Sequence, residues 1–236
     1  MREHRLEVLR TARFYTLGPR GTPLHEAWFV LHGYRQLASR FLRRFEVLDD
    51  GTRLLVAPEA LSRFYVDPSP GRHGSEARVG ATWMTREDRL AEIGDYVRYL
   101  DAVLEAILSE LPEPPARVVV LGFSQGCHTA ARWTVLGRVR PARLFLWGDY
   151  LPHDLPEAKA RERLGSTGVT VVHGRRDPSL RSELMEAHEA RLRALGVRFE
   201  HVLYDGGHEI EAEPLLRLAG GVVQNSPMKP ISGTSS

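Results

Sequence analysis

The chain has 236 residues, of which 42% are hydrophobic and 26% are charged. This length suits one domain and this composition is ordinary for a globular protein, which excludes an intrinsically disordered chain. The 32 basic and 30 acidic residues leave a formal charge of +2, and the arginines are scattered along the chain, which argues against nucleic acid as a partner.

Short patterns exclude several other classes. No apolar run reaches the roughly 18 residues that a membrane-spanning helix needs, and the N-terminus, MREHRLEVLR, lacks the apolar stretch of a signal peptide. Cys127 is the only cysteine, so the sequence offers no intrachain disulfide and no multi-cysteine metal site. We therefore expect a cytoplasmic protein, and we leave its oligomeric state open.

The predicted elements begin with strands. Residues 5–16 are rich in β-formers and indicate one or two N-terminal antiparallel strands. Short, continuous apolar runs, which are typical of parallel strands buried on both faces, follow at 27–31, 54–57, 118–121, 144–147 and 169–172. A last strand is predicted at about 198–204.

Segments with helical periodicity separate these strands. The clearest runs from about 86 to 111 and ends before Pro112, and Thr85 with Asp88 resembles a capping box at its start. Weaker helices are predicted at about 126–137, 157–164, 180–195 and 211–219. Strands that alternate with helices imply βαβ crossovers. The sequence therefore predicts an α/β fold, with a mostly parallel sheet flanked by helices on both faces in a three-layer sandwich.

The domain organisation follows from the same pass along the chain. We expect a single domain over residues 1–224 and a disordered tail over 225–236, which reads NSPMKPISGTSS. Residues 58–84 have no regular period and carry several prolines and glycines. Such a long connection is usually functional.

Ser124 stands in a Gly-x-Ser-x-Gly motif that follows a predicted buried strand and precedes a predicted helix. This context is typical of a nucleophile elbow. Gly122 and Gly126 fit it because strand and helix approach closely at these two positions. We therefore predict that Ser124 is a catalytic nucleophile near the positive end of the helix dipole.

A serine hydroxyl needs a base to take its proton and an acid to orient that base. His208 follows the last strand in Tyr-Asp-Gly-Gly-His and is the last histidine of the chain, which fits the order serine, acid, histidine. We predict His208 as the base and Asp177, which follows the strand at 169–172, as the acid. Asp149 and Asp205 remain alternative acids.

Two backbone amides are expected to bind the oxyanion: those of Gln125, directly after the nucleophile, and of Tyr34, in the turn after the first buried strand. His32 and His173 each precede a glycine at a strand end and are expected to make structural hydrogen bonds, whereas His128 is expected to pack. No metal site is predicted, because His208-Glu-Ile-Glu lacks the second histidine of a zinc motif.

These residues together make the sequence resemble the phospholipase/carboxylesterase family of α/β-hydrolases, which includes acyl-protein thioesterases. The resemblance covers most of residues 25–210 and rests above all on Gly122-Phe-Ser-Gln-Gly, with Leu31-His-Gly, Thr82-Trp-Met, Gly148-Asp-Tyr-Leu-Pro and His173-Gly-Arg-Arg-Asp. It implies the α/β-hydrolase fold and the hydrolysis of a small acyl ester or thioester, an EC 3.1 activity, through an acyl-enzyme and without a cofactor or metal.

The sequence also departs from the family. Arg35 and Gln36 stand where a glycine and an aspartate are common, and Cys127 stands where a further glycine is usual. The segment 58–84 looks unlike the family's usual connection, and it supplies four candidate residues for a substrate pocket: Phe64, Tyr65, Trp83 and Met84. Two other functions stay open, namely a peptidase or amidase with the same triad and a non-catalytic binding protein that keeps the fold.

Overall fold

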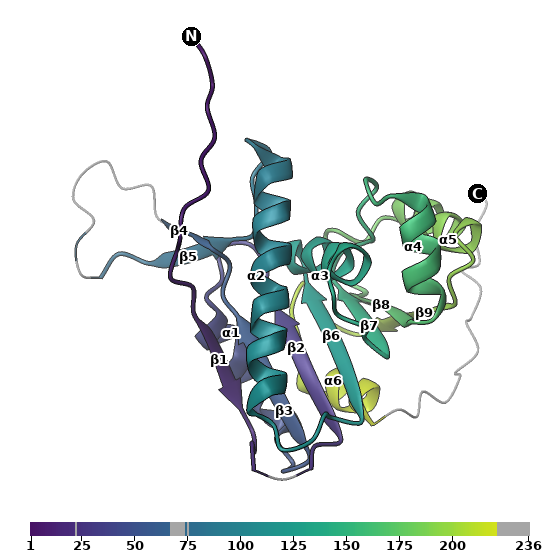
Figure 1. The fold of residues 1–236 in the computed structure, drawn as a ribbon. Helices are drawn as coiled ribbons and strands as arrows, with labels where there is room; N and C mark the ends of the chain where they lie inside the picture. The colour runs from purple at the N-terminus through teal and green to yellow at the C-terminus, as the bar shows by residue number, and fades with distance from the viewer. Residues whose placement is uncertain (22, 67–73, 75, 221–236) are drawn as a thin grey trace.

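A seven-stranded sheet in the order β1-β3-β2-β6-β7-β8-β9 forms the centre of the molecule (Figure 1). The computed structural model describes residues 1–21, 23–66, 74 and 76–220, so the predicted tail at 225–236 lies outside the described residues. In chain order the elements are β1 (Phe14–Leu17), β2 (Glu26–Leu31), α1 (Ala38–Leu42), the 3-10 helix η1 (Arg43–Leu48), β3 (Arg53–Pro58), β4 (Ser62–Tyr65), β5 (Val79–Thr82), α2 (Arg89–Glu110), β6 (Arg117–Phe123), α3 (Gln125–Leu136), β7 (Arg143–Trp147), α4 (Glu157–Gly165), β8 (Gly168–Gly174), α5 (Ser182–Ala194), β9 (Phe199–Tyr204) and α6 (Ala212–Ala219).

The central strands are parallel, as their continuous apolar sequences predict. β2 pairs with β3 and β6, and β7 and β8 continue the parallel series to β9. Every residue of β2 is buried, because helices cover both faces of the sheet. β1 pairs with β3 in the antiparallel direction, but it begins only at Phe14, so the residues before it do not extend the predicted N-terminal strand.

Two hydrophobic clusters, one on each face of the sheet, confirm the predicted three layers. On one face, side chains such as Phe29, Val120 and Val171 pack with α2, α3, α4 and α5. On the other face, Trp28 and Leu121 pack with α1, η1 and α6. Alternate residues of one strand thus serve opposite layers, as the two-residue period of a strand requires.

The start of α2 differs from the prediction. Asp88, the residue before the helix, has a left-handed conformation (φ 44°) and makes no capping hydrogen bond with its side chain. The Thr85 hydroxyl instead accepts a hydrogen bond from the Glu87 amide at 3.2 Å, and the Thr85 amide donates to Glu92. The predicted capping box is wrong because a local turn at Thr85 takes up the hydroxyl group.

Two segments contain structure that periodicity does not reveal. Residues 38–48 form α1 and η1, which are too short for a helical stripe to be recognised. Within 58–84, β4 and β5 form an antiparallel pair, so this connection is partly regular rather than irregular throughout. A bridge between Gln36 and Ala81 ties β5 to the turn after β2. Across the described ranges, no helix combines the length and the apolar character that crossing a membrane requires.

Candidate active site

Ser124 occupies the turn between β6 and α3 with φ 52° and ψ −122°, a conformation that residues other than glycine rarely adopt. The two flanking glycines are needed for this turn. A Cβ atom on Gly122 would lie 2.2 Å from the carbonyl oxygen of Gly126, and one on Gly126 would lie 2.2 Å from that of Leu31. The Ser124 amide donates a 2.8 Å hydrogen bond to the carbonyl of Trp147, which fixes the turn against the next strand.

Asp177 and His208 form a hydrogen-bonded pair. Nδ1 of His208 lies 2.7 Å from Oδ2 of Asp177, while the amide and hydroxyl of Ser179 donate to Oδ1 at 2.8 and 2.6 Å. Burial raises the pKa of the Asp177 carboxyl, but the hydrogen bonds from Ser179 and His208 outweigh it and leave the pKa below its ordinary value. Asp177 is therefore an ionised acceptor that keeps the proton of the imidazole on Nδ1.

The imidazole of His208 lies beside the nucleophile turn. Its ring is 4.9 Å from that of Phe123, the residue before Ser124. A Cβ atom on Gly148 would lie 3.0 Å from Cε1 of His208, so the absence of a side chain at Gly148 makes room for the ring. Among the described residues, Nε2 of His208 takes part in no hydrogen bond, so none joins it to Ser124. Such contacts often tighten only when substrate binds.

The two alternative acids make other contacts. Asp149 accepts a 2.8 Å hydrogen bond from the Tyr150 amide and lies 3.5 Å from Nε2 of His128. The Asp205 side chain is 82% exposed and pairs with Arg176. The structure thus brings Asp177, and neither Asp149 nor Asp205, to His208.

The turn after β2 carries the predicted oxyanion amides. Among the described residues, neither the Tyr34 amide nor the Gln125 amide donates a hydrogen bond, whereas their neighbours are occupied. The Gly33 amide donates to Oε1 of Gln36 at 2.8 Å, and the Arg35 amide donates to the carbonyl of Ala81 at 3.0 Å. Gln36 is one of the departures from the family pattern, and its side chain here orders the turn.

The side chain of Gln125 holds the segment before α2 against the nucleophile turn. Its Oε1 accepts a 3.1 Å hydrogen bond from the Trp83 amide, and its Nε2 donates to Oγ1 of Thr82 and to the carbonyl of Met84, each at 2.9 Å. Sequence reasoning assigned only the backbone of Gln125. The Gln125 clamp, as we call these three hydrogen bonds, depends on a contact between distant segments.

The four candidate pocket residues lie in different environments. Trp83 is 2% exposed and donates from Nε1 to the carbonyl of His32 at 2.8 Å. Phe64 stacks on Tyr34 with ring centroids 5.3 Å apart, and Tyr65 is 48% exposed. The Met84 sulfur lies 3.5 Å from Nη1 of Arg132. A substrate pocket formed by Phe64, Tyr65, Trp83 and Met84 stays a prediction.

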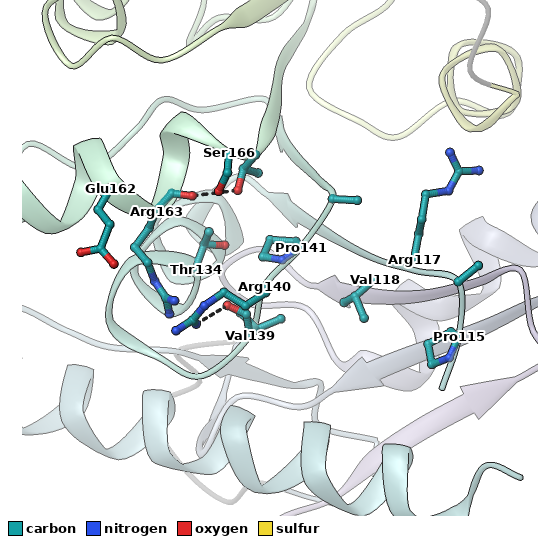
Figure 2. Close-up of a pocket in the computed structure, with 13 residues that line it drawn as sticks. Pro115, Arg117, Val118, Thr134, Val139, Arg140, Pro141, Glu162, Arg163 and Ser166 are labelled. Atoms are coloured by element: carbon teal, nitrogen blue, oxygen red, sulfur yellow. Dashed lines mark hydrogen bonds between the residues drawn. The ribbon is translucent and has the colours of Figure 1, made fainter. Parts of the chain in front are cut away.

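A cavity of about 500 Å³ lies elsewhere, at the amino ends of β6, β7 and β8 (Figure 2). Arg140 and Arg163 line it and donate hydrogen bonds to carbonyl groups at the end of α3, among them that of Gly137. Ser124 follows the carboxyl end of β6, whereas this cavity lies at the amino end of the same strand. The cavity and the candidate active site are therefore at opposite ends of the parallel strands.

Buried histidines support the loops around the site. His32 accepts a 3.1 Å hydrogen bond from the Ala60 amide, and His188 accepts one of 2.9 Å from the Leu151 amide. Nδ1 of His173 lies 3.2 Å from Nε2 of His201. The structure thus gives His32 and His173 the structural hydrogen bonds that the sequence predicts. Burial lowers the pKa of His32 and His173 to about 4 and that of His188 to about 3.

These shifts predict that the free energy of unfolding falls steeply as the pH drops from 7 towards 4. In the unfolded chain each histidine binds a proton near its ordinary pKa of 6.5, whereas His32, His173 and His188 stay neutral in the folded chain until about pH 4 or below. Each group therefore contributes a slope of about 1.4 kcal/mol per pH unit between these limits. Urea unfolding at a series of pH values measures the slope. An unfolding free energy that stays constant between pH 6.5 and 5 would contradict the prediction.

Comparison with known proteins identifies the family and the fold. Residues 81–219 match the Phospholipase/Carboxylesterase family. No curated protein sequence matches the chain. Esterase PE8 has a similar solved structure, with a TM-score of 0.66 and 19% identity over 91% of this chain and 100% of that chain. Acyl-protein thioesterase 2 of Zea mays (TM-score 0.64, 18% identity, 89% and 97% of the two chains) and a carboxylesterase from Mesorhizobium loti (0.65, 16%, 89% and 95%) share the fold. The chain belongs to the phospholipase/carboxylesterase family of α/β-hydrolases.

Proposed function

We propose that this protein is a serine hydrolase that cleaves carboxylic esters or thioesters through an acyl-enzyme formed on Ser124. The observation that carries the proposal is the 2.7 Å hydrogen bond between Asp177 and His208, formed directly beside a strained serine turn. A buried carboxylate, an imidazole and a serine in this order form the arrangement that activates a hydroxyl group as a nucleophile.

The reaction follows from the positions of the protons. Asp177 holds the proton of His208 on Nδ1, so Nε2 is free to take the proton of Ser124 as Oγ attacks the carbonyl carbon. The amides of Tyr34 and Gln125 donate to the oxyanion that forms. The protonated His208 then gives its proton to the departing alcohol or thiol.

Deacylation repeats the sequence with water. His208 takes a proton from a water molecule as the water oxygen attacks the acyl group on Ser124, and the proton returns to Ser124 as the bond to Oγ breaks. One ester or thioester and one water give one carboxylic acid and one alcohol or thiol. No step requires a cofactor.

Several fold neighbours carry the names esterase, carboxylesterase and acyl-protein thioesterase, which supports an ester or thioester rather than an amide as the substrate. Matched ester and anilide substrates with the same acyl group test this part of the proposal. Faster hydrolysis of the anilide would favour the peptidase or amidase alternative.

A fluorophosphonate probe tests the nucleophile itself. Folded protein is expected to react with one equivalent of probe, and mass spectrometry of the digested adduct is expected to place the label on the peptide that contains Ser124. Heat-unfolded protein is the control, because labelling depends on the activated geometry and should then disappear. Absence of a label on folded protein, or a label on another serine, would refute the proposal.

A further inference from the structure

We propose that Asp149 selects substrates whose acyl group carries a positive charge. This inference rests on the proposed function, because it assigns a substrate class to the same site. It starts from two polar side chains that the mechanism does not use, Asp149 in the loop after β7 and His128 in α3, which lie 3.5 Å apart and which we call the Asp149–His128 pair.

Backbone contacts connect the Asp149–His128 pair to the nucleophile turn. His128 is in α3, one helical turn beyond Ser124. Asp149 follows Gly148, the residue that lies against the His208 ring, and Trp147 before it accepts the hydrogen bond of the Ser124 amide. Asp149 is therefore one residue from a contact of His208 and two residues from a hydrogen-bond partner of Ser124, and His128 is one helical turn from Ser124.

Among the described residues, only one of the two carboxylate oxygens of Asp149 has a polar partner. Oδ1 accepts the Tyr150 amide at 2.8 Å and lies 3.5 Å from Nε2 of His128, while Oδ2 has no hydrogen bond within the part of the chain that the structure describes. The side chains of Asp149 and His128 are 32% and 37% exposed, so both are accessible to a ligand. The sequence led us to expect that His128 is buried by packing, and this prediction is wrong. A ligand can thus reach a negatively charged acceptor here.

The next charged residue of α3, Arg132, already has an ion-pair partner. Arg132 is 4% exposed and donates to Oδ1 of Asp154 at 2.8 Å, and Arg89 pairs with Oδ2 of the same carboxylate. These three groups hold the loop after β7 to α2 and α3. Asp149 differs from Asp154 in that, among the described residues, it pairs with a histidine and with no arginine.

The position of His208 indicates which part of the substrate Asp149 meets. Phe123, which contacts His208, packs in the cluster of α1, η1 and α6, whereas His128 lies on α3, over the opposite face of the sheet. His208 must protonate the leaving group, so that group lies on its side of Ser124. The acyl group then extends towards α3 and the Asp149–His128 pair, where a carboxylate favours a cation and disfavours an aliphatic chain.

Two esters of the same shape test the inference: the p-nitrophenyl esters of 4-(trimethylammonio)butanoic acid and of 5,5-dimethylhexanoic acid, which differ in a quaternary nitrogen against a quaternary carbon. The wild type is expected to prefer the cationic ester in kcat/KM by about two- to fivefold, the size of one partly exposed charge pair. Asp149→Asn keeps an acceptor for the Tyr150 amide and is expected to bring this ratio close to 1.

A second variant guards against a general effect of Asp149→Asn on the loop. His128→Arg leaves Asp149 in place but sets a positive charge beside it, and it is expected to lower the ratio as well. Asp95→Asn, which removes an exposed charge from α2, is the control and should leave the ratio unchanged.

The outcomes separate the inference from the proposed function. Hydrolysis of neither ester by the wild type would overturn the proposed function. Hydrolysis of both esters with no preference for the cationic one, or with a preference that Asp149→Asn does not reduce, would overturn the role of Asp149 and leave the proposed function standing.

Discussion

Ser124→Ala is expected to lower kcat for an acyl ester by at least about 10⁴-fold, because the serine and histidine of such a site act as one unit and the loss of either removes the covalent pathway. The remaining rate over that in water comes from the oxyanion amides and from substrate binding. The strained turn is expected to persist, since alanine differs from serine only by the hydroxyl group. Steady-state hydrolysis of p-nitrophenyl acetate measures the loss.

Ser109→Ala is the matched control for this experiment. Ser109 lies in α2 with an exposed hydroxyl that donates to the carbonyl of Ala106 within the same helix, so its removal should leave kcat unchanged. Circular dichroism of both variants checks that the fold is retained. A folded Ser124→Ala variant with more than about a tenth of the wild-type kcat would contradict the assignment of the nucleophile.

Asp177→Asn is expected to lower kcat by about 10⁴-fold while leaving the fold intact. An asparagine in this place can donate its amide hydrogen to Nδ1 of His208, which moves the imidazole proton to Nε2. His208 then faces Ser124 with a proton instead of a lone pair. The hydrogen bonds from Ser179 can be kept by the amide oxygen, so the loop after β8 should change little.

Asp205→Asn provides the comparison, because Asp205 lies three residues before His208 and its side chain is exposed. It removes the same charge without touching the imidazole, so its kcat should stay near the wild-type value. If Asp205→Asn lost as much activity as Asp177→Asn, the loss would have to come from the charge of this region rather than from the orientation of the ring.

The fold could be predicted from the sequence because its signals are local. The runs at 27–31 and 118–121 are apolar throughout since both faces of their strands are covered, and this feature alone indicates a parallel sheet between helices. The serine turn is equally local, because the spacing of Gly122, Ser124 and Gly126 reflects steric limits within five residues.

What the sequence did not reveal depends on contacts between distant segments. The Gln125 clamp joins residues about 40 positions apart, and the pairing of β4 with β5 spans a segment without regular period. The same holds for Asp149, which sequence reasoning treated as a second candidate acid. Only the positions of the loops after β7 and β8 show that Asp177 reaches His208, while Asp149 lies near His128.

The Gln125 clamp has a consequence for how substrate enters. The residue whose backbone amide would bind the oxyanion also ties residues 82–84 to the start of α3 through its side chain. A movement of residues 82–84 away from Ser124 would have to give up these hydrogen bonds and would release the donor itself. If the Gln125 amide binds the oxyanion as proposed, this donor is already ordered before substrate arrives, and the entropy of placing it is lost when the chain folds rather than in each catalytic cycle.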